Sequence, residues 1–330
     1  MAVKNLDTAA DRSIAAVLGS AAGDALAIPY ASSPDLLSKA PADQPLQVTS
    51  GGQWSQGEWA SSTAMSIPVL QALSKDFSLG PGAPVEVPNF VAQEWLEWQK
   101  SGGKGGDDRL SKLFQATADE QSKSGGGVFP YGTAMTKLAR QQGKSGNSDN
   151  NRAPARMTSL ALGFLAPGQE TALVKAAIAL TDLTEPDQDA QEASALVALG
   201  IRNAILTGKL DLEKMTDFLP ENRRETWKER IADGYKVDPE DFAKVNHSAI
   251  GAFKAAVAAN AGADDVATAI DKATRGGGQS DRVAAIAGAW AGARFGSKSV
   301  PQWSSKLHGW PCKANDLQTL VSTVMNRYKQ

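Results

Sequence analysis

Residue types that bind metals or form cross-links are scarce in this sequence. Its 330 residues include one cysteine, Cys312, and two histidines, His247 and His308. One cysteine excludes a disulfide within the chain and a thiolate metal cluster. Two histidines exclude a histidine-rich zinc site. The low cysteine content also fits a reducing compartment, so we expect a cytoplasmic protein.

An excess of charge of one sign and long apolar runs are also missing. The formal net charge is −2, from 34 basic and 36 acidic residues, so no overall field would attract nucleic acid. No run approaches the ~18 uninterrupted apolar residues of a membrane span, and the first residues lack the apolar core of a signal peptide. Hydrophobic residues make up 42% and charged residues 21%, which is typical of a globular protein. We therefore expect no binding to nucleic acids or membranes.

Alternating β-branched runs are almost absent, and apolar residues recur at helical spacing along most of the chain. The first helix is expected to follow Asp7 and to end at Pro29. A second should begin near Ser62, with Ser61 or Ser62 as its N-cap and a distortion at Pro68. Each of these boundaries follows from local capping and proline chemistry alone.

The remaining chain predicts further helices separated by polar loops. After a helix that carries Trp95 and Trp98, helices are expected over 107–122, 170–183, 186–208, 247–260 and 264–276, and a solvated surface pair of helices is expected over 211–234. Flexible loops are expected at about 31–52, 78–88, 122–132 and 143–154. Gly208 should follow the last turn of its helix, and Asn315 or Asp316 should cap the final one. The prediction is an all-α fold with a single domain, 1–330, held by close helix packing through small residues.

The segment 274–296 is the most distinctive of the chain. A glycine triplet, 276–278, precedes Gln279, Ser280, Asp281 and Arg282, and an Ala/Gly-rich helix follows. Ser280 or Asp281 is expected to cap this helix. Because its side chains are small, neighbouring helices can approach closely, which suits the centre of a bundle. A flexible polar turn at the mouth of a buried helix is a candidate site.

Several motifs in one order carry a resemblance to a known family. They are GDALAIPY (23–30), GEWASSTAM (57–65), LTEPDQDA (183–190) and RGGGQSDRVAAIAGAWAGARFG (275–296), followed by VPQW and LHGWP. The chain resembles the ADP-ribosylglycohydrolase family from about 8 to 328, and its C-terminal third is most similar to the actinobacterial form. The family removes ADP-ribose from dinitrogenase reductase or from arginine or serine. The resemblance implies a compact all-α orthogonal helix bundle with two Mg or Mn ions in a central cleft.

The positions that hold those ions in the family are mostly substituted here. The family's T-D-D-T corresponds to Ala-Ser-Ser-Thr at 60–63, and its D-T-D-T corresponds to Gln-Ser-Asp-Arg at 279–282, which leaves only Asp281. Its acidic residue after the first motif falls at Ala31, and its T-H falls at Thr184 and Glu185. The G-N-G-S-L-M-R loop has a partial counterpart at 150–156. Four carboxylates and one histidine of the family pattern are therefore replaced.

These substitutions argue against a dinuclear metal site. Hard divalent cations need several anionic or carbonyl oxygens. The positive charge of Arg282 would oppose a divalent ion by ~8 kcal/mol at ~4 Å with an effective dielectric constant of ~20. We therefore expect no metal cofactor. The hypothesis is that the Arg282 guanidinium occupies the former metal space, neutralises Asp281 and can bind a phosphate. The alternatives are an Arg282 that points to the surface and an Asp281 that only caps its helix.

The resulting cleft is expected to bind a ligand without a catalytic residue. Its expected lining residues are Ser61, Ser62, Thr63, Asn151, Glu185, Gln279, Ser280, Asp281 and Arg282. Trp54 and Trp59 flank the 60–63 motif and could stack on a base or ribose, with core packing the simpler interpretation for Trp59. The leading hypothesis is a degenerate family member, a pseudoenzyme that binds ADP-ribose, a related nucleotide or a protein partner. The alternatives are an active glycohydrolase with an altered or single-metal site and a structural or assembly subunit.

Overall fold

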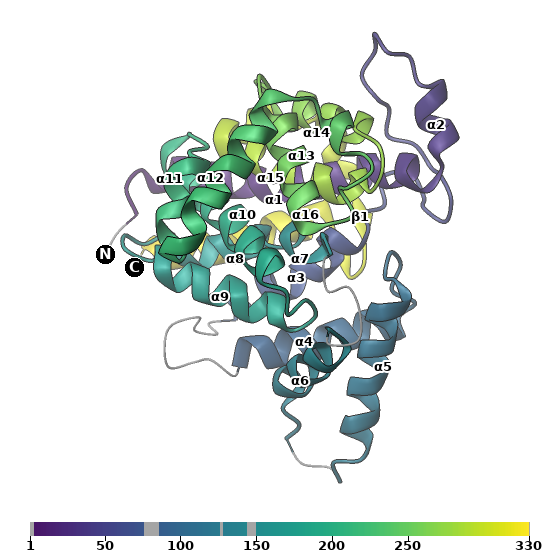
Figure 1. Ribbon diagram of the computed structural model, residues 1–330, viewed down its shortest axis with the longest axis vertical. Coiled ribbons are helices and arrows are strands. Elements are labelled where there is room, and N and C mark those ends of the chain that lie inside the picture. The colour runs from purple at the N-terminus through teal and green to yellow at the C-terminus, as the bar shows by residue number, and fades with distance from the viewer. Residues whose placement is uncertain (1–2, 76–85, 126–127, 144–149, 330) are drawn as a thin grey trace.

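Helices form nearly all of the regular structure of the protein. The computed structural model describes residues 3–75, 86–125, 128–143 and 150–329 (Figure 1). Within these residues the two regular strands are β1 (His308–Gly309) and β2 (Cys312–Lys313), which pair as one antiparallel hairpin. The all-α prediction is confirmed, whereas the single domain stays a prediction.

The α-helices follow one another along the whole chain. They are α1 (Leu6–Ser32), α2 (Pro34–Lys39), α3 (Ser61–Ser74), α4 (Glu86–Lys100), α5 (Asp108–Ser122), α6 (Tyr131–Gly143), α7 (Arg152–Ala155), α8 (Thr158–Ala161), α9 (Glu170–Asp182), α10 (Gln188–Thr207), α11 (Leu212–Met215), α12 (Glu221–Lys236), α13 (Ala249–Asn260), α14 (Val266–Arg275), α15 (Ser280–Phe295) and α16 (Ala314–Asn326). Short 3-10 helices lie at Leu162–Phe164, Thr216–Phe218, Pro239–Phe242, Ser297–Ser299, Gln302–Lys306 and Arg327–Lys329. In Figure 1, α4, α5 and α6 lie together at one end of the molecule.

The centre of the bundle is a close contact between α1 and α15. A Cβ atom added at Gly288 would lie 2.1 Å from the carbonyl oxygen of Gly19, and one at Gly23 would lie 2.0 Å from that of Ala284. Because these distances are far below van der Waals contact, the two backbones can approach this closely only through glycine. The expected packing through small residues is present at this contact.

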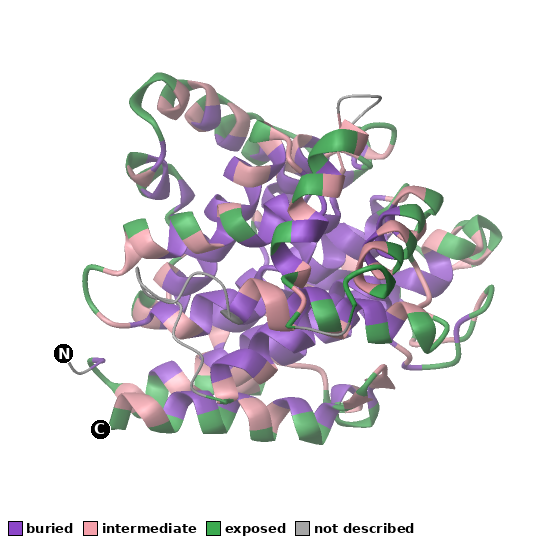
Figure 2. Ribbon diagram, turned by 90° about the horizontal axis from the view of Figure 1, so that it is seen from below, coloured by how far each residue is buried: buried purple, intermediate pink, exposed green. Residues whose placement is uncertain are grey.

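The long apolar helix α1 lies in the core of the protein. An 18-residue window within Leu6–Ser32 has a mean hydropathy of 1.4, and 89% of that window is buried inside the fold. It is the only helix of the described residues that is long and apolar enough to cross a membrane. Figure 2 shows buried residues concentrated on the inner helices. The apolar character of α1 is therefore accounted for by its packing against other helices.

The expected end of the first helix at Pro29 is wrong. Helix α1 continues through Pro29 to Ser32, and α2 lies within the segment 31–52 that was expected to be a loop. Buried Ile28 and Tyr30 hold the last turn against the core, and the Tyr30 hydroxyl donates to the Gln47 carbonyl at 2.8 Å. Tertiary contacts thus outweigh the lost proline hydrogen bond.

The other helix ends follow the sequence more closely. Gly208 ends α10 with φ at 74°, in the left-handed region, as expected for glycine after a last turn. Pro186 lies before Asp187, whose side chain caps α10 by accepting from Ala190 at 3.0 Å. The final helix begins at Ala314, slightly earlier than expected, with the Asp316 carboxylate accepting from the Lys313 N–H at 2.9 Å.

Three of the expected loops are only partly described. Residues 78–85, 126–127 and 144–149 lie outside the described residues. Helix α4 already begins at Glu86, α6 begins at Tyr131, and α7 occupies the end of the expected loop 143–154. The expected surface pair at 211–234 needs a correction as well, because Trp227 of α12 is fully buried and packs edge-on against Phe253.

Candidate functional site

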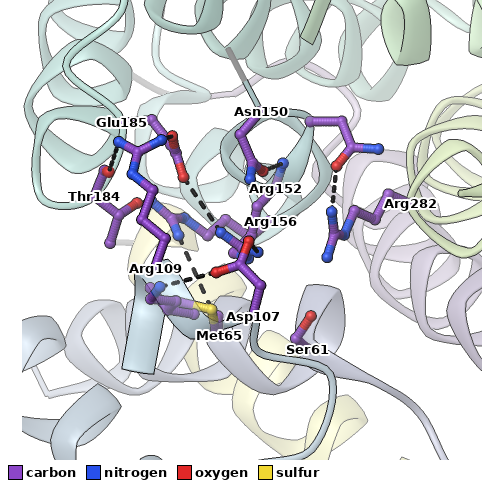
Figure 3. A network of polar contacts seen from close by, with 12 residues as sticks. Ser61, Met65, Asp107, Arg109, Asn150, Arg152, Arg156, Thr184, Glu185 and Arg282 are labelled. Atoms are coloured by element: carbon purple, nitrogen blue, oxygen red, sulfur yellow. Dashed lines mark hydrogen bonds and ion pairs between the residues drawn. The ribbon is translucent and has the colours of Figure 1, made fainter. Parts of the chain in front are cut away.

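The residues expected to line the cleft come from four separate parts of the chain. Ser61, Ser62 and Thr63 form the first turn of α3, Asn151 precedes α7, Glu185 follows α9, and the others lie at the start of α15. All of them are buried except Gln279, which is exposed. In Figure 3, Ser61, Glu185 and Arg282 surround the same polar network.

The Arg282 guanidinium lies inside this network, with only 9% of the residue exposed. Its Nη1 donates to Asn151 Oδ1 at 2.5 Å and to Gln279 Oε1 at 2.6 Å. Its Nε lies 3.9 Å from Asp281 Oδ2. Burial lowers the pKa of Arg282, and the charge of Arg152 lowers it further, while Asp281 opposes both effects. The alternative of a surface-pointing Arg282 is therefore wrong.

Two asparagines hold the turn that presents Arg282. The Asn151 side chain donates to the Asn246 carbonyl at 2.6 Å, and Asn246 Oδ1 accepts from the Gln279 N–H at 2.9 Å. Gly278 has φ at 62°, and a Cβ there would lie 2.3 Å from the Ala243 carbonyl oxygen. The turn thus requires glycine and the Asn246 amide. Asn246 belongs to no motif, so the sequence offered no signal for it.

Asp24, rather than a serine, caps α3. Its Oδ2 accepts from the N–H groups of Ala60 at 3.1 Å and Thr63 at 2.9 Å, whereas Ser61 is already helical and donates to the Gly105 carbonyl at 3.2 Å. Burial, reinforced by the charge of Asp281, raises the pKa of Asp24 to about 7. The expected Ser61 or Ser62 cap is wrong because a carboxylate from α1 reaches the same N–H groups.

The expected cap of α15 is also wrong. Helix α15 begins at Ser280 and follows Gln279, and neither Ser280 nor Asp281 precedes it as a capping residue. Ser280 Oγ has no hydrogen-bond partner among the described residues, and neither have Ser62 Oγ and Arg282 Nε. Buried polar atoms are normally satisfied, so these atoms are the ones that a ligand or water would bond.

A buried ion-pair cluster adjoins Arg282. Arg152 donates from Nη2 to Asp107 Oδ2 at 2.7 Å and from Nη1 to Glu185 Oε1 at 3.3 Å. The side chains of Arg152 and Glu185 are each 1% exposed. Arg109 Nη1 lies 3.2 Å from Glu185 Oε2. Glu185 is therefore enclosed by guanidinium groups rather than open to a ligand.

Arg156 completes the cluster from the other side. Its Nη2 donates to Thr184 Oγ1 at 2.7 Å, and its guanidinium lies 4.3 Å from the centre of the Trp95 ring. Burial lowers the pKa of Arg156 to about 9, although Glu185 opposes this shift. Burial also raises the pKa of Glu185, against the arginines around it.

Part of this cluster was foreseeable and part was not. Asn151, Arg152 and Arg156 come from the segment 150–156 that resembles the family's ligand-holding loop. Asp107 caps α5 through its Oδ1, which accepts from the Leu110 N–H at 2.8 Å. Its position at the start of a predicted helix was the only feature of the sequence that pointed to Asp107. Arg109 lies outside every motif, and only the fold brings it to Glu185.

Comparison with known proteins agrees with this architecture. The ADP-ribosylglycohydrolase family model matches residues 5–330. A solved structure described as an ADP-ribosylglycohydrolase-related protein complex superimposes with a TM-score of 0.70 over 98% of this chain and 100% of that chain, at 20% sequence identity. No curated protein sequence matches significantly. Because the family model covers nearly the whole chain and the fold agrees, this protein belongs to the ADP-ribosylglycohydrolase family.

Proposed function

We propose that this protein is a catalytically degenerate family member that binds ADP-ribose or a related nucleotide without the family's metal pair. The observation that carries the proposal is the buried Arg282 guanidinium, held between Asn151 and Gln279 beside Asp281. We also propose a cytoplasmic location, on the cysteine content of the sequence.

The available oxygen donors do not suit two divalent cations. Asp281 faces the Arg282 guanidinium, and Asp24 uses one carboxylate oxygen to cap α3. The remaining donors, such as Ser62 and Ser280, are neutral hydroxyls. A pair of hard divalent ions needs bridging carboxylates, which these residues do not supply.

An anion suits the same space better. Arg152 lies close enough to Arg282 to lower its pKa, so the two positive charges oppose each other. A phosphate near both groups would relieve that repulsion. Arg282 Nε has no hydrogen-bond partner among the described residues, and a guanidinium recognises phosphate through paired N–H donors. The diphosphate of ADP-ribose has this chemistry.

The test is calorimetry with ADP-ribose in the presence of a chelator. Wild-type protein should bind at micromolar concentration, and Arg282→Ala should bind at least about tenfold more weakly, which corresponds to ~1.4 kcal/mol. Arg140→Ala is the matched control, because the Arg140 side chain is 61% exposed and pairs with Asp182. Binding that requires Mg²⁺ or Mn²⁺ would contradict the proposal.

Two further measurements separate the other functions. Release of ADP-ribose from a modified protein, abolished by Asp281→Ala, would show an active glycohydrolase and overturn the proposal. No nucleotide binding, together with a stable protein complex recovered from cells, would favour a structural or assembly subunit instead.

A further inference from the structure

A pocket lined by tryptophans lies beside the start of α3. Its volume is about 110 Å³. Trp54, Trp59, Trp98 and Trp310 line it, together with Glu58 and the segment 101–104 that follows α4. The first three indoles are almost completely buried, and Trp310 is partly exposed. Ala60 and Ala64, which flank the Ser61–Thr63 turn, also line the pocket, so it adjoins the candidate cleft, although neither Arg282 nor its hydrogen-bond partners line it.

Two of the four indoles that line this pocket already use their N–H groups in hydrogen bonds. Trp54 Nε1 donates to Ser32 Oγ at 3.2 Å, and Trp59 Nε1 donates to the Trp310 carbonyl at 3.0 Å. Both N–H groups are thus already used. A Cβ at Gly103 would lie 2.8 Å from the Trp98 ring, so the backbone there packs directly on the indole.

The pocket also contains an ion pair, between Lys104 and Glu58, in which the ammonium lies over an indole ring. The Lys104 ammonium lies 5.5 Å from the centre of the Trp54 ring, 2.7 Å from Glu58 Oε1 and 3.1 Å from the Gln53 carbonyl oxygen. The Lys104 side chain is 40% exposed, whereas that of Glu58 is 15% exposed. The chain's own cation therefore sits against an aromatic face and a carboxylate, on a flexible stem that can return to solvent.

We propose that this tryptophan pocket binds an organic cation of the alkylated ammonium class, which takes the place of the Lys104 ammonium. Aromatic faces attract a cation through the ring quadrupole, and indole is the strongest of the side chains in this respect. Glu58 supplies the opposite charge. The volume is close to the ~150 Å³ of a cavity that holds benzene, which suits a trimethylammonium group.

Glu58 remains available to such a ligand in its ionised form. Burial opposes its ionisation, but the hydrogen bonds from Lys104 and Ser55 outweigh burial and lower the pKa of the Glu58 carboxyl. Ser55 donates to Glu58 Oε2 from both its N–H and its hydroxyl, at 3.0 and 2.8 Å. These two bonds do not involve Lys104, so they keep the carboxylate in place when the lysine moves away.

The probe is choline, compared with its uncharged carbon isostere 3,3-dimethyl-1-butanol. Choline should quench the tryptophan fluorescence of the full-length protein saturably, and the isostere should bind at least about tenfold more weakly, because it has the same shape without the charge. Lys104→Ala should strengthen choline binding several-fold by removing the competing ammonium. Glu58→Gln should weaken it several-fold. Lys100→Ala is the matched control, since that side chain is exposed and pairs with Glu97.

Equal affinity for choline and its isostere would overturn the proposal, as would weaker choline binding by Lys104→Ala. The isostere comparison needs no variant, and Lys104 is at the surface. The proposal therefore remains testable even where Glu58→Gln fails to fold. Nucleotide binding at Arg282 is measured separately, so failure of one proposal does not decide the other.

Discussion

At the scale of single residues, Asp24 shows how one buried carboxylate can serve a distant helix. It belongs to α1 but accepts hydrogen bonds from the first N–H groups of α3, and no part of it is exposed. A charged cap on a helix N-terminus is favourable, whereas burial of that charge is not. The balance leaves its pKa at about 7.

We expect Asp24→Asn to change how stability depends on pH. The pKa of Asp24 rises from 3.8 to about 7 on folding, so in this interval the folded state holds a proton that the unfolded state lacks. Its contribution to stability is complete below the lower value and is lost as the pH rises to the higher one. Between pH 4 and 7, urea unfolding should show the wild type losing stability relative to the variant as the pH rises, on the order of 1 kcal/mol per pH unit.

The matched control for this experiment is Asp43→Asn, because Asp43 is exposed in the segment after α2. The stability of the Asp43→Asn variant should depend on pH in the same way as that of the wild type. Parallel profiles for Asp24→Asn and the wild type would contradict the assignment of the buried carboxylate.

A second residue-scale prediction concerns Arg152. Arg152→Met leaves Glu185 buried with fewer partners, so unfolding in urea should show a loss of about 3 kcal/mol or more. Adding Glu185→Leu should recover part of that loss, because it removes a buried carboxylate that has lost Arg152 and keeps Arg109 at 3.2 Å. Arg140→Ala should lose no more than about 1 kcal/mol, because the Arg140 side chain is 61% exposed. A double variant less stable than Arg152→Met would contradict this account.

At the scale of elements, the contact between α1 and α15 sets the geometry of the candidate site. Asp24 lies on one of these helices, and Asp281 and Arg282 lie on the other. Because Gly19 and Gly288 allow the backbones to touch, the two carboxylates come close enough for Asp281 to raise the pKa of Asp24. A wider helix spacing would separate these groups.

Gly288→Ala tests this contact, because the two possible causes of its effect change the free energy of unfolding in opposite directions. Helix propensity alone predicts that alanine stabilises α15 by up to ~1 kcal/mol. Packing predicts the opposite, because the new Cβ would lie 2.1 Å from the Gly19 carbonyl oxygen. We expect a net loss of ~1–3 kcal/mol in thermal or urea unfolding. An increase in stability would show that the helices do not touch in this way.

At the scale of the whole molecule, stability should be unevenly distributed. Helix α15 is almost entirely buried, and residues 15–30 of α1 are all buried, whereas α5 buries four residues, Leu110, Leu113, Phe114 and Thr117. Hydrogen exchange measured by mass spectrometry should therefore be slowest in α1 and α15 and faster in α5 and α6. Equal protection of all these helices would contradict this distribution.

Sequence patterns alone determined the helical class, most helix positions, the family and the substitutions at 60–63 and 279–282. These properties depend on local spacing and on motif order, which the chain carries in one dimension. The tertiary structure decided which groups meet: Asp24 at the start of α3, Asn246 at the Arg282 turn, and Arg109 at Glu185. Such contacts depend on how closely helices far apart in the chain approach, and that distance is set by packing across the whole core.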